Sequence, residues 1–103
     1  MAEDLLRKLE MEVDLSTWRD LRAHAARDKL FIVTPKLTLV QVGMALAGDD
    51  AVAVQNWIEA GHLVRPSRSQ MDEWEKQLER TFRCLIISPF VLAQLASTGL
   101  DLN

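Results

Sequence analysis

The spacing of apolar and polar side chains predicts short helices that alternate with short apolar strands. Near the N-terminus (1–14), Leu5, Leu9 and Val13 lie on one side of a helical projection, with charged residues between them. This pattern predicts an amphipathic helix over residues 3–13. A second helix is expected to begin near Thr17, which has an aspartate three residues later, a spacing typical of a helix cap.

Three short runs rich in apolar and branched side chains are typical of buried strands. They cover residues 30–33, 62–65 and 82–88. The first two end next to Pro35 and Pro66, which cannot donate a backbone hydrogen bond to a neighbouring strand. The sequence therefore predicts a sheet of three strands, with parallel pairing across a crossover helix.

The clearest local signal is the start of a helix over 38–47. Thr38 and Gln41 have the spacing of a capping box, in which each side chain bonds the other residue's backbone N–H. This helix is apolar almost all round, so it is expected to be a central core helix or part of an interface. Asp49 or Asp50 is then expected to cap a helix over 51–60, which is closed by a glycine at position 61.

Two further helices complete the prediction. Ser67 and Gln70 form a second capping box, for a helix over 69–80. Pro89 suits the first turn of a last helix over 90–97. The predicted fold class is α+β, in the order α-α-β-α-α-β-α-β-α, with a small three-stranded sheet covered by helices. Residues 1–103 are expected to form a single domain, with a frayed tail at 99–103.

Composition excludes some functions and indicates none. The chain has 103 residues and a formal net charge of −3, which offers no general attraction for nucleic acid or anionic membranes. The acidic N-terminus is the reverse of a signal peptide, and Cys84 is the sole cysteine. The uncharged stretch 84–100 is divided by Ser88-Pro89, so a strand and a short helix explain it better than a membrane span. We therefore predict a cytoplasmic protein.

No pattern in the chain predicts a catalytic residue, a cofactor or a metal. Asp20 and His24 are spaced as an ordinary i,i+4 pair on a helix, although an Asp–His pair can also serve as a general base. Cys84 lies in an apolar strand, where a thiol is a weak nucleophile. The spacing of Asp49-Asp50 and His62 matches no closed metal-binding motif. The sequence alone therefore assigns no activity.

Several motifs between Trp18 and Gln94 resemble a small bacterial family of uncharacterised proteins, a domain of unknown function. The residues that carry the resemblance are Trp18, Leu21 and His24; Pro35, Leu37, Leu39 and Val40; Asp49, Asp50, Val54 and Trp57; Gly61, Leu63, Val64 and Arg65; Trp74; and Ser88-Pro89-Phe90-Val91-Leu92 with Gln94. Phe90 and Thr38 depart from the expected tryptophan and aspartate, but each keeps the local role, as an aromatic anchor and a helix cap. The resemblance implies a bacterial cytosolic protein and carries over no activity.

The sharpest functional pattern is the helix-turn-helix-like pair at 38–60, which imitates the core of a winged-helix DNA reader. Its second helix contains no Lys or Arg, so phosphate would be repelled and DNA binding is disfavoured. We therefore interpret the pair as a surface for protein contacts. Its predicted interaction residues are Asp49, Asp50, Gln55, Asn56 and Glu59.

The functional prediction is a non-enzymatic protein-interaction or self-associating domain. The predicted helices at 38–47 and 90–97 each contain a single internal polar side chain, a glutamine. Together they would have more apolar surface than one small domain can cover. The sequence therefore predicts a homodimer through these helices or an unknown protein partner. The alternative is a degenerate winged-helix nucleic-acid-binding protein.

Overall fold

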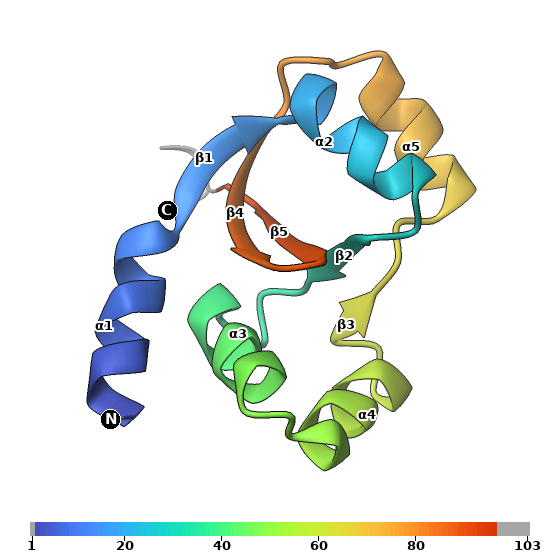
Figure 1. Ribbon diagram of the computed structural model, residues 1–103. Coiled ribbons are helices and arrows are strands. Elements are labelled where there is room, and N and C mark those ends of the chain that lie inside the picture. The colour runs from blue at the N-terminus through green and yellow to red at the C-terminus, as the bar shows by residue number, and fades with distance from the viewer. Residues whose placement is uncertain (1, 97–103) are drawn as a thin grey trace.

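The computed structural model describes residues 2–96 and has five helices and a five-stranded mixed sheet (Figure 1). The elements in chain order are α1 (Ala2–Glu12), β1 (Asp14–Thr17), α2 (Trp18–Ala26), β2 (Leu30–Val33), α3 (Leu39–Ala47), α4 (Ala51–Glu59), β3 (Leu63–Val64), α5 (Arg68–Glu75), β4 (Thr81–Ile87) and β5 (Phe90–Leu95). The predicted α+β class is confirmed, and the three-stranded sheet is wrong. The tail predicted at 99–103 lies outside the described residues.

The strands are arranged in the order β1-β4-β5-β2-β3. The parallel pair is β2 with β5, while β1 with β4, β4 with β5 and β2 with β3 are antiparallel. The two strands that the sequence analysis missed are β1 and β5. They occupy different environments, because β1 is an edge strand and β5 lies at the centre of the sheet.

The helix predicted over 90–97 is wrong, because residues 90–95 form the central strand β5. This strand follows β4 in a hairpin that turns at Ser88-Pro89, a cis peptide bond, and pairs Ile87 with Phe90. Val91, Leu92 and Ala93 are all buried. A strand buried on both faces is apolar throughout, so its sequence cannot be distinguished by periodicity from that of a short buried helix.

The start of α2 was predicted correctly, but the reason for it was not. Thr17 is the N-cap residue, yet its side chain makes no capping hydrogen bond. Instead, the backbone N–H groups of Trp18 and Arg19 donate to the carbonyl oxygens of Arg80 and Leu78, each at 3.0 Å. A distant loop therefore satisfies helix N–H groups that otherwise need a local cap.

The carbonyl groups of Leu78 and Arg80 lie in a loop, because α5 ends before them and is shorter than predicted. The capping box of Ser67 and Gln70 is present, but the helix ends at Glu75 and not near residue 80. Along this helix, Asp72 lies 3.6 Å from Arg68 in an i,i+4 ion pair. The chain after Glu75 is then free to turn towards α2 before it enters β4.

The sheet separates two apolar clusters, one on each face (Figure 1). On one face, α2 and α5 bring Trp18 and Trp74 together, with ring centroids 5.1 Å apart, and Trp74 contacts Phe82 of β4. On the other face, α1 and α3 pack on Leu85 of β4 and Leu92 of β5. The apolar helix 38–47 is thus a core helix, with its capping box formed as predicted.

Close packing of α3 on the sheet depends on Gly43. A Cβ atom at this position would lie 2.8 Å from Cδ2 of the buried Leu85. Glycine therefore allows the α3 backbone to approach β4 more closely than any other residue would. This contact covers the apolar side of α3, the feature from which a dimer interface was predicted.

Candidate functional site

The predicted interaction residues of the helix pair at 38–60 are all exposed at the α3–α4 end of the molecule. Asp50 is the N-cap of α4 and accepts from the N–H of Ala53 at 3.1 Å, as predicted for one of the two aspartates. The Gln55 amide donates to Glu59 at 3.1 Å. Gln55 and Asn56 are the uncharged polar side chains of α4 that could contact base edges, and this bond engages one of them.

The space beside these residues is small. A hollow of about 220 Å³ lies between α3 and α4, lined by Ala45, Leu46, Asp49, Asp50, Ala51 and Val54. Binding pockets for small ligands usually enclose about 300 to 1,000 Å³. The α3–α4 pair therefore exposes a surface without a pocket of that size.

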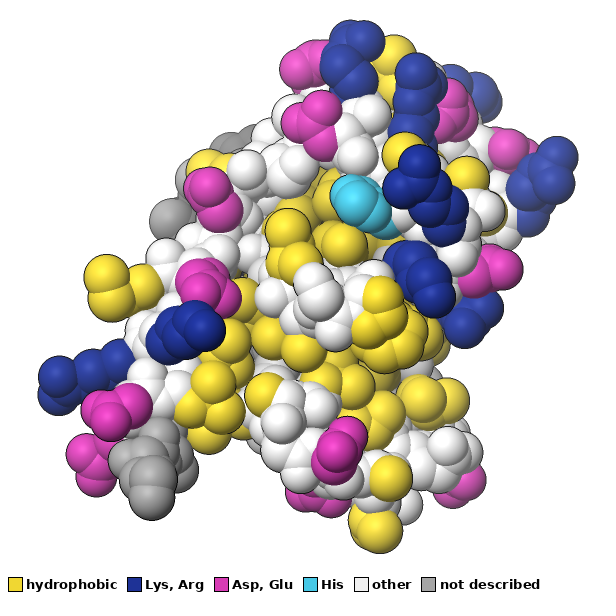
Figure 2. Space-filling model, in the orientation of Figure 1, with side chains coloured by type: hydrophobic (Ala, Val, Ile, Leu, Met, Phe, Trp, Pro, Cys, Tyr) yellow, Lys and Arg dark blue, Asp and Glu magenta, His cyan; other side chains and the backbone are white. Residues whose placement is uncertain are grey.

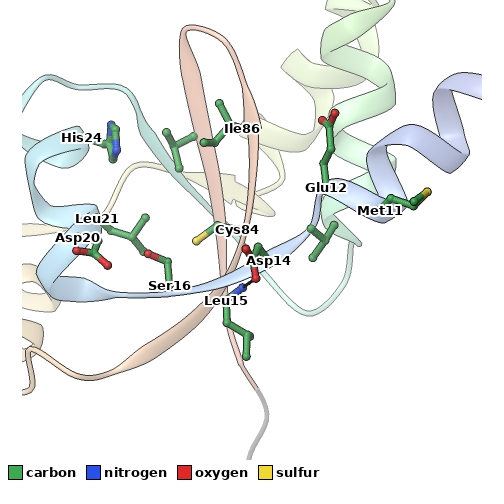
Figure 3. A pocket seen from close by; sticks show the side chains of 12 residues that line it. Met11, Glu12, Asp14, Leu15, Ser16, Asp20, Leu21, His24, Cys84 and Ile86 are labelled. Atoms are coloured by element: carbon green, nitrogen blue, oxygen red, sulfur yellow. Dashed lines mark hydrogen bonds between the residues drawn. The ribbon is translucent and has the colours of Figure 1, made fainter.

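A larger groove, of about 680 Å³, lies at the opposite side of the sheet, where α1, β1, α2 and β4 meet (Figure 3). Its size falls in the range of ligand sites. The lining residues are Met11, Glu12, Val13, Asp14, Leu15, Ser16, Asp20, Leu21, His24, Cys84, Ile86 and Val91. Asp20, His24 and Cys84 were separate candidates in the sequence, and no pattern there joined Cys84 to the other two.

The groove exists because α2 covers only part of its face of the sheet. Along β4, Phe82 is fully buried, Cys84 is 8% exposed and Ile86 is 61% exposed. These three side chains alternate onto the same face, as the period of a strand requires. The sheet is thus covered at Phe82 and open at Ile86, and Asp14 of β1 lies beside Cys84 in register.

The groove is acidic, and its carboxylates are not neutralised. Glu12, Asp14 and Asp20 line it, and within residues 2–96 none of the three forms an ion pair. Asp14 accepts a hydrogen bond from the Leu15 N–H at 2.8 Å, and no Lys or Arg lines the groove. Negative charge and apolar side chains therefore share one concave surface.

Several arginines are paired with carboxylates outside the groove. Bonds of 2.8 and 2.9 Å join Arg19 to Glu79 and Arg22 to Glu75 across α2 and the α5 region. Arg65 lies 3.6 Å from Asp28. Figure 2 shows Lys and Arg gathered mainly over the α2–α5 end of the face in view, with others along α1. The charge of the molecule is thus unevenly distributed.

A family model described as "Protein of unknown function (DUF2288)" matches residues 4–95. The chain belongs to this family. The match confirms the resemblance seen between Trp18 and Gln94 and extends it over α1 and β1. The DUF2288 chain is also similar to a solved protein, described as the NMR solution structure of PA1075 from Pseudomonas aeruginosa. The two share 29% identity and a TM-score of 0.77, with 92% of this chain and 87% of the other covered. Among curated proteins, none matches.

The groove of this DUF2288 protein contains the residue types of catalytic sites, but they do not form a catalytic pair. Asp20 and His24 both line it, and no hydrogen bond or ion pair joins them. In nucleophile–base arrangements, the base is oriented by a hydrogen bond to a further group. Among residues 2–96, no group of three His, Cys, Asp or Glu side chains is placed to hold a metal ion.

From the sequence, a strand and a short helix explained the uncharged stretch 84–100 better than a membrane span. No helix within residues 2–96 is long and apolar enough to cross a bilayer.

Cys84 provides a pH-dependent test of the groove. Burial, and to a smaller extent the Asp14 carboxylate, raises the pKa of its thiol from 9.0 to about 12. The unfolded chain therefore loses this proton first as the pH rises. The contribution of Cys84 to stability is complete below about pH 9 and is lost between about pH 9 and 12.

We expect the free energy of unfolding of the wild-type protein to fall more steeply over this range than that of Cys84→Ala. Urea titrations at a series of pH values measure the difference. A second variant, Asp14→Asn, should lower the pKa of the thiol, seen as faster alkylation by iodoacetamide at pH 9. Parallel pH profiles for the wild type and Cys84→Ala would contradict the assignment.

Proposed function

We propose that this DUF2288 protein is a non-enzymatic protein-interaction domain, and that the groove between α1, β1, α2 and β4 is its docking surface. The observation that carries the proposal is a cluster of exposed apolar side chains around an acidic hollow. Met11 is 85% exposed and Ile86 61%, and both line the groove. Leu15, 63% exposed, lines it from β1, with its side chain on the opposite face of that strand from Asp14 (Figure 3). Exposed apolar side chains grouped at one concave site, with polar groups around them, are typical of protein-interaction surfaces.

Two features of the groove argue against catalysis there. The thiol of Cys84 has a pKa near 12, so it is protonated at neutral pH and is a poor nucleophile. Asp20 and His24 make no bond to each other. A docking role requires neither group to be reactive.

The grounds for interaction differ from those predicted from the sequence. Of the two apolar helices expected to form a dimer, 90–95 is the buried strand β5, and α3 buries Leu39, Val42, Gly43 and Ala45 against the sheet. Three of the exposed large apolar side chains, Met11, Leu15 and Ile86, line the groove. We therefore propose docking at this groove in place of the homodimer that was predicted through two apolar helices.

Selection from a random peptide library displayed on phage tests the proposal. We expect the wild-type protein to enrich peptides that bind about tenfold more weakly to a variant carrying Met11→Gln, Leu15→Gln and Ile86→Gln. These side chains are exposed, so the variant should remain folded, with each change costing within about 0.5 kcal/mol. The matched control is Val52→Gln, which removes a similarly exposed apolar side chain from α4. Failure to enrich any peptide, or equal binding to the triple variant, would overturn the proposal.

A further inference from the structure

We infer that the groove takes a protein segment in which a lysine or arginine lies among apolar side chains; this rests on the docking role proposed above. The first ground is charge complementarity. Glu12, Asp14 and Asp20 come from three successive elements, α1, β1 and α2, and line the same space (Figure 3). A cationic side chain placed there would meet carboxylates from more than one side.

The second ground is that the protein itself does not neutralise these carboxylates. Asp28, Glu75 and Glu79 each have an arginine within 4 Å, but Glu12, Asp14 and Asp20 have none within the described part of the chain. An exposed carboxylate attracts an approaching cation, and this attraction strengthens as the partner's surface displaces water from around the pair. The groove thus offers an incoming Lys or Arg a gain that the paired carboxylates elsewhere do not offer.

The exposed apolar side chains that line the groove (the apolar rim) determine which side chains of the partner must flank its cation. Met11 and Ile86 are exposed in the same groove as the carboxylates, so a partner that brought charge alone would leave them in water. A segment with apolar side chains on either side of its Lys or Arg covers the rim and meets the acidic centre. Arg and Lys also bury their own methylene stems against apolar surface.

A second copy of this chain fits the groove less well. A symmetric dimer through this face would bring two sets of three carboxylates together, in a protein whose net charge is already −3. Addition of a sixth strand at β1 is also hindered, because the Leu15 N–H is donated to Asp14 Oδ1 within the same strand. The occupant is therefore a different protein, held mainly through its side chains.

Fluorescence anisotropy with a labelled nonapeptide tests this inference. The probe alternates lysines with leucines, and its counterpart has glutamates in place of the lysines. We expect the full-length protein to bind the lysine peptide, and Asp14→Asn with Asp20→Asn to weaken that binding about three- to tenfold. Raising NaCl from about 50 to about 500 mM should also weaken it several-fold. The matched control is Asp49→Asn with Glu59→Gln, which removes two charges from the α3–α4 end.

The outcomes separate this inference from the proposed function. Loss of affinity in the groove variant, with the control variant unchanged, supports a basic segment. Equal loss in both variants, or equal binding of the glutamate peptide, would show attraction to net charge and overturn it. If phage selection enriches groove-binding peptides that lack Lys and Arg, the docking role stands and the basic partner is wrong. A dimer, detected by light scattering and lost in the Met11, Leu15 and Ile86 variant, would also overturn it.

Discussion

Trp18→Ala is expected to destabilise the fold by about 3–5 kcal/mol, the cost of removing a large aromatic side chain from a packed core. Trp18 is 1% exposed and packs against Trp74. Its indole Nε1 donates to Glu75 Oε2 at 2.6 Å, so the variant also loses a bond between α2 and α5. A domain of this size has a total stability of about 5–15 kcal/mol, so a large part of it is at risk.

Urea denaturation followed by circular dichroism measures this loss. Trp18→Phe keeps one aromatic ring in the core and loses the pyrrole ring with its N–H donor, so it should cost less than half as much and remain folded if Trp18→Ala does not. The control is Val52→Ala on the exposed side of α4, which should change stability by no more than about 0.5 kcal/mol. A loss below about 1 kcal/mol for Trp18→Ala would contradict its place at the centre of the α2–α5 core.

Gln94→Leu is expected to cost about 1–3 kcal/mol, because it leaves the part-buried carbonyl oxygen of Leu37 without this donor, while that of Thr34 keeps only the Leu37 N–H. The Gln94 amide donates to the carbonyl oxygens of Leu37 at 2.8 Å and Thr34 at 3.0 Å. These bonds connect β5 to the loop between β2 and α3. Leucine has a similar size, so the loss is one of hydrogen bonding more than of packing.

The matched control is Gln55→Leu. Gln55 makes one side-chain hydrogen bond, to Glu59, and this bond is exposed on α4. Thermal denaturation of both variants should show a clear decrease in Tm for Gln94→Leu and a much smaller change for Gln55→Leu. Similar shifts for the two would mean that Gln94 does not hold the β2–α3 loop in place.

Local signals in the sequence were sufficient wherever a few adjacent residues decide the structure. The capping boxes at Thr38 with Gln41 and at Ser67 with Gln70 are both present. In a capping box, the donors and acceptors lie within four residues of each other, so the pattern contains the whole interaction. The strand over 30–33 was also predicted with its observed bounds, since a proline closely follows it.

The sequence was insufficient where distant residues decide. Phe90 was read as the start of a helix, but as the first residue of β5 it packs edge-on against Phe31 of β2, with centroids 5.7 Å apart. The edge strand β1 gave no signal, because four half-exposed residues have no apolar pattern of their own. Its pairing with β4 is visible only after β4 is in place.

The groove was unpredictable for the same reason. Asp14, Asp20 and Cys84 are separated by up to seventy positions in the chain, and no local motif joins them. They meet because β1 pairs with β4 while α2 leaves the Ile86 end of β4 uncovered.

The sequence alone was therefore sufficient for the family, the α+β class, the capping boxes of α3 and α5, and the lack of basic residues in α4. Each of these depends on composition or on residues close together in the chain. Only the tertiary structure decided the five-stranded order, the role of Gln94 and the acidic groove. Strand pairing and partial covering of a sheet depend on contacts between distant segments, which local propensity does not specify.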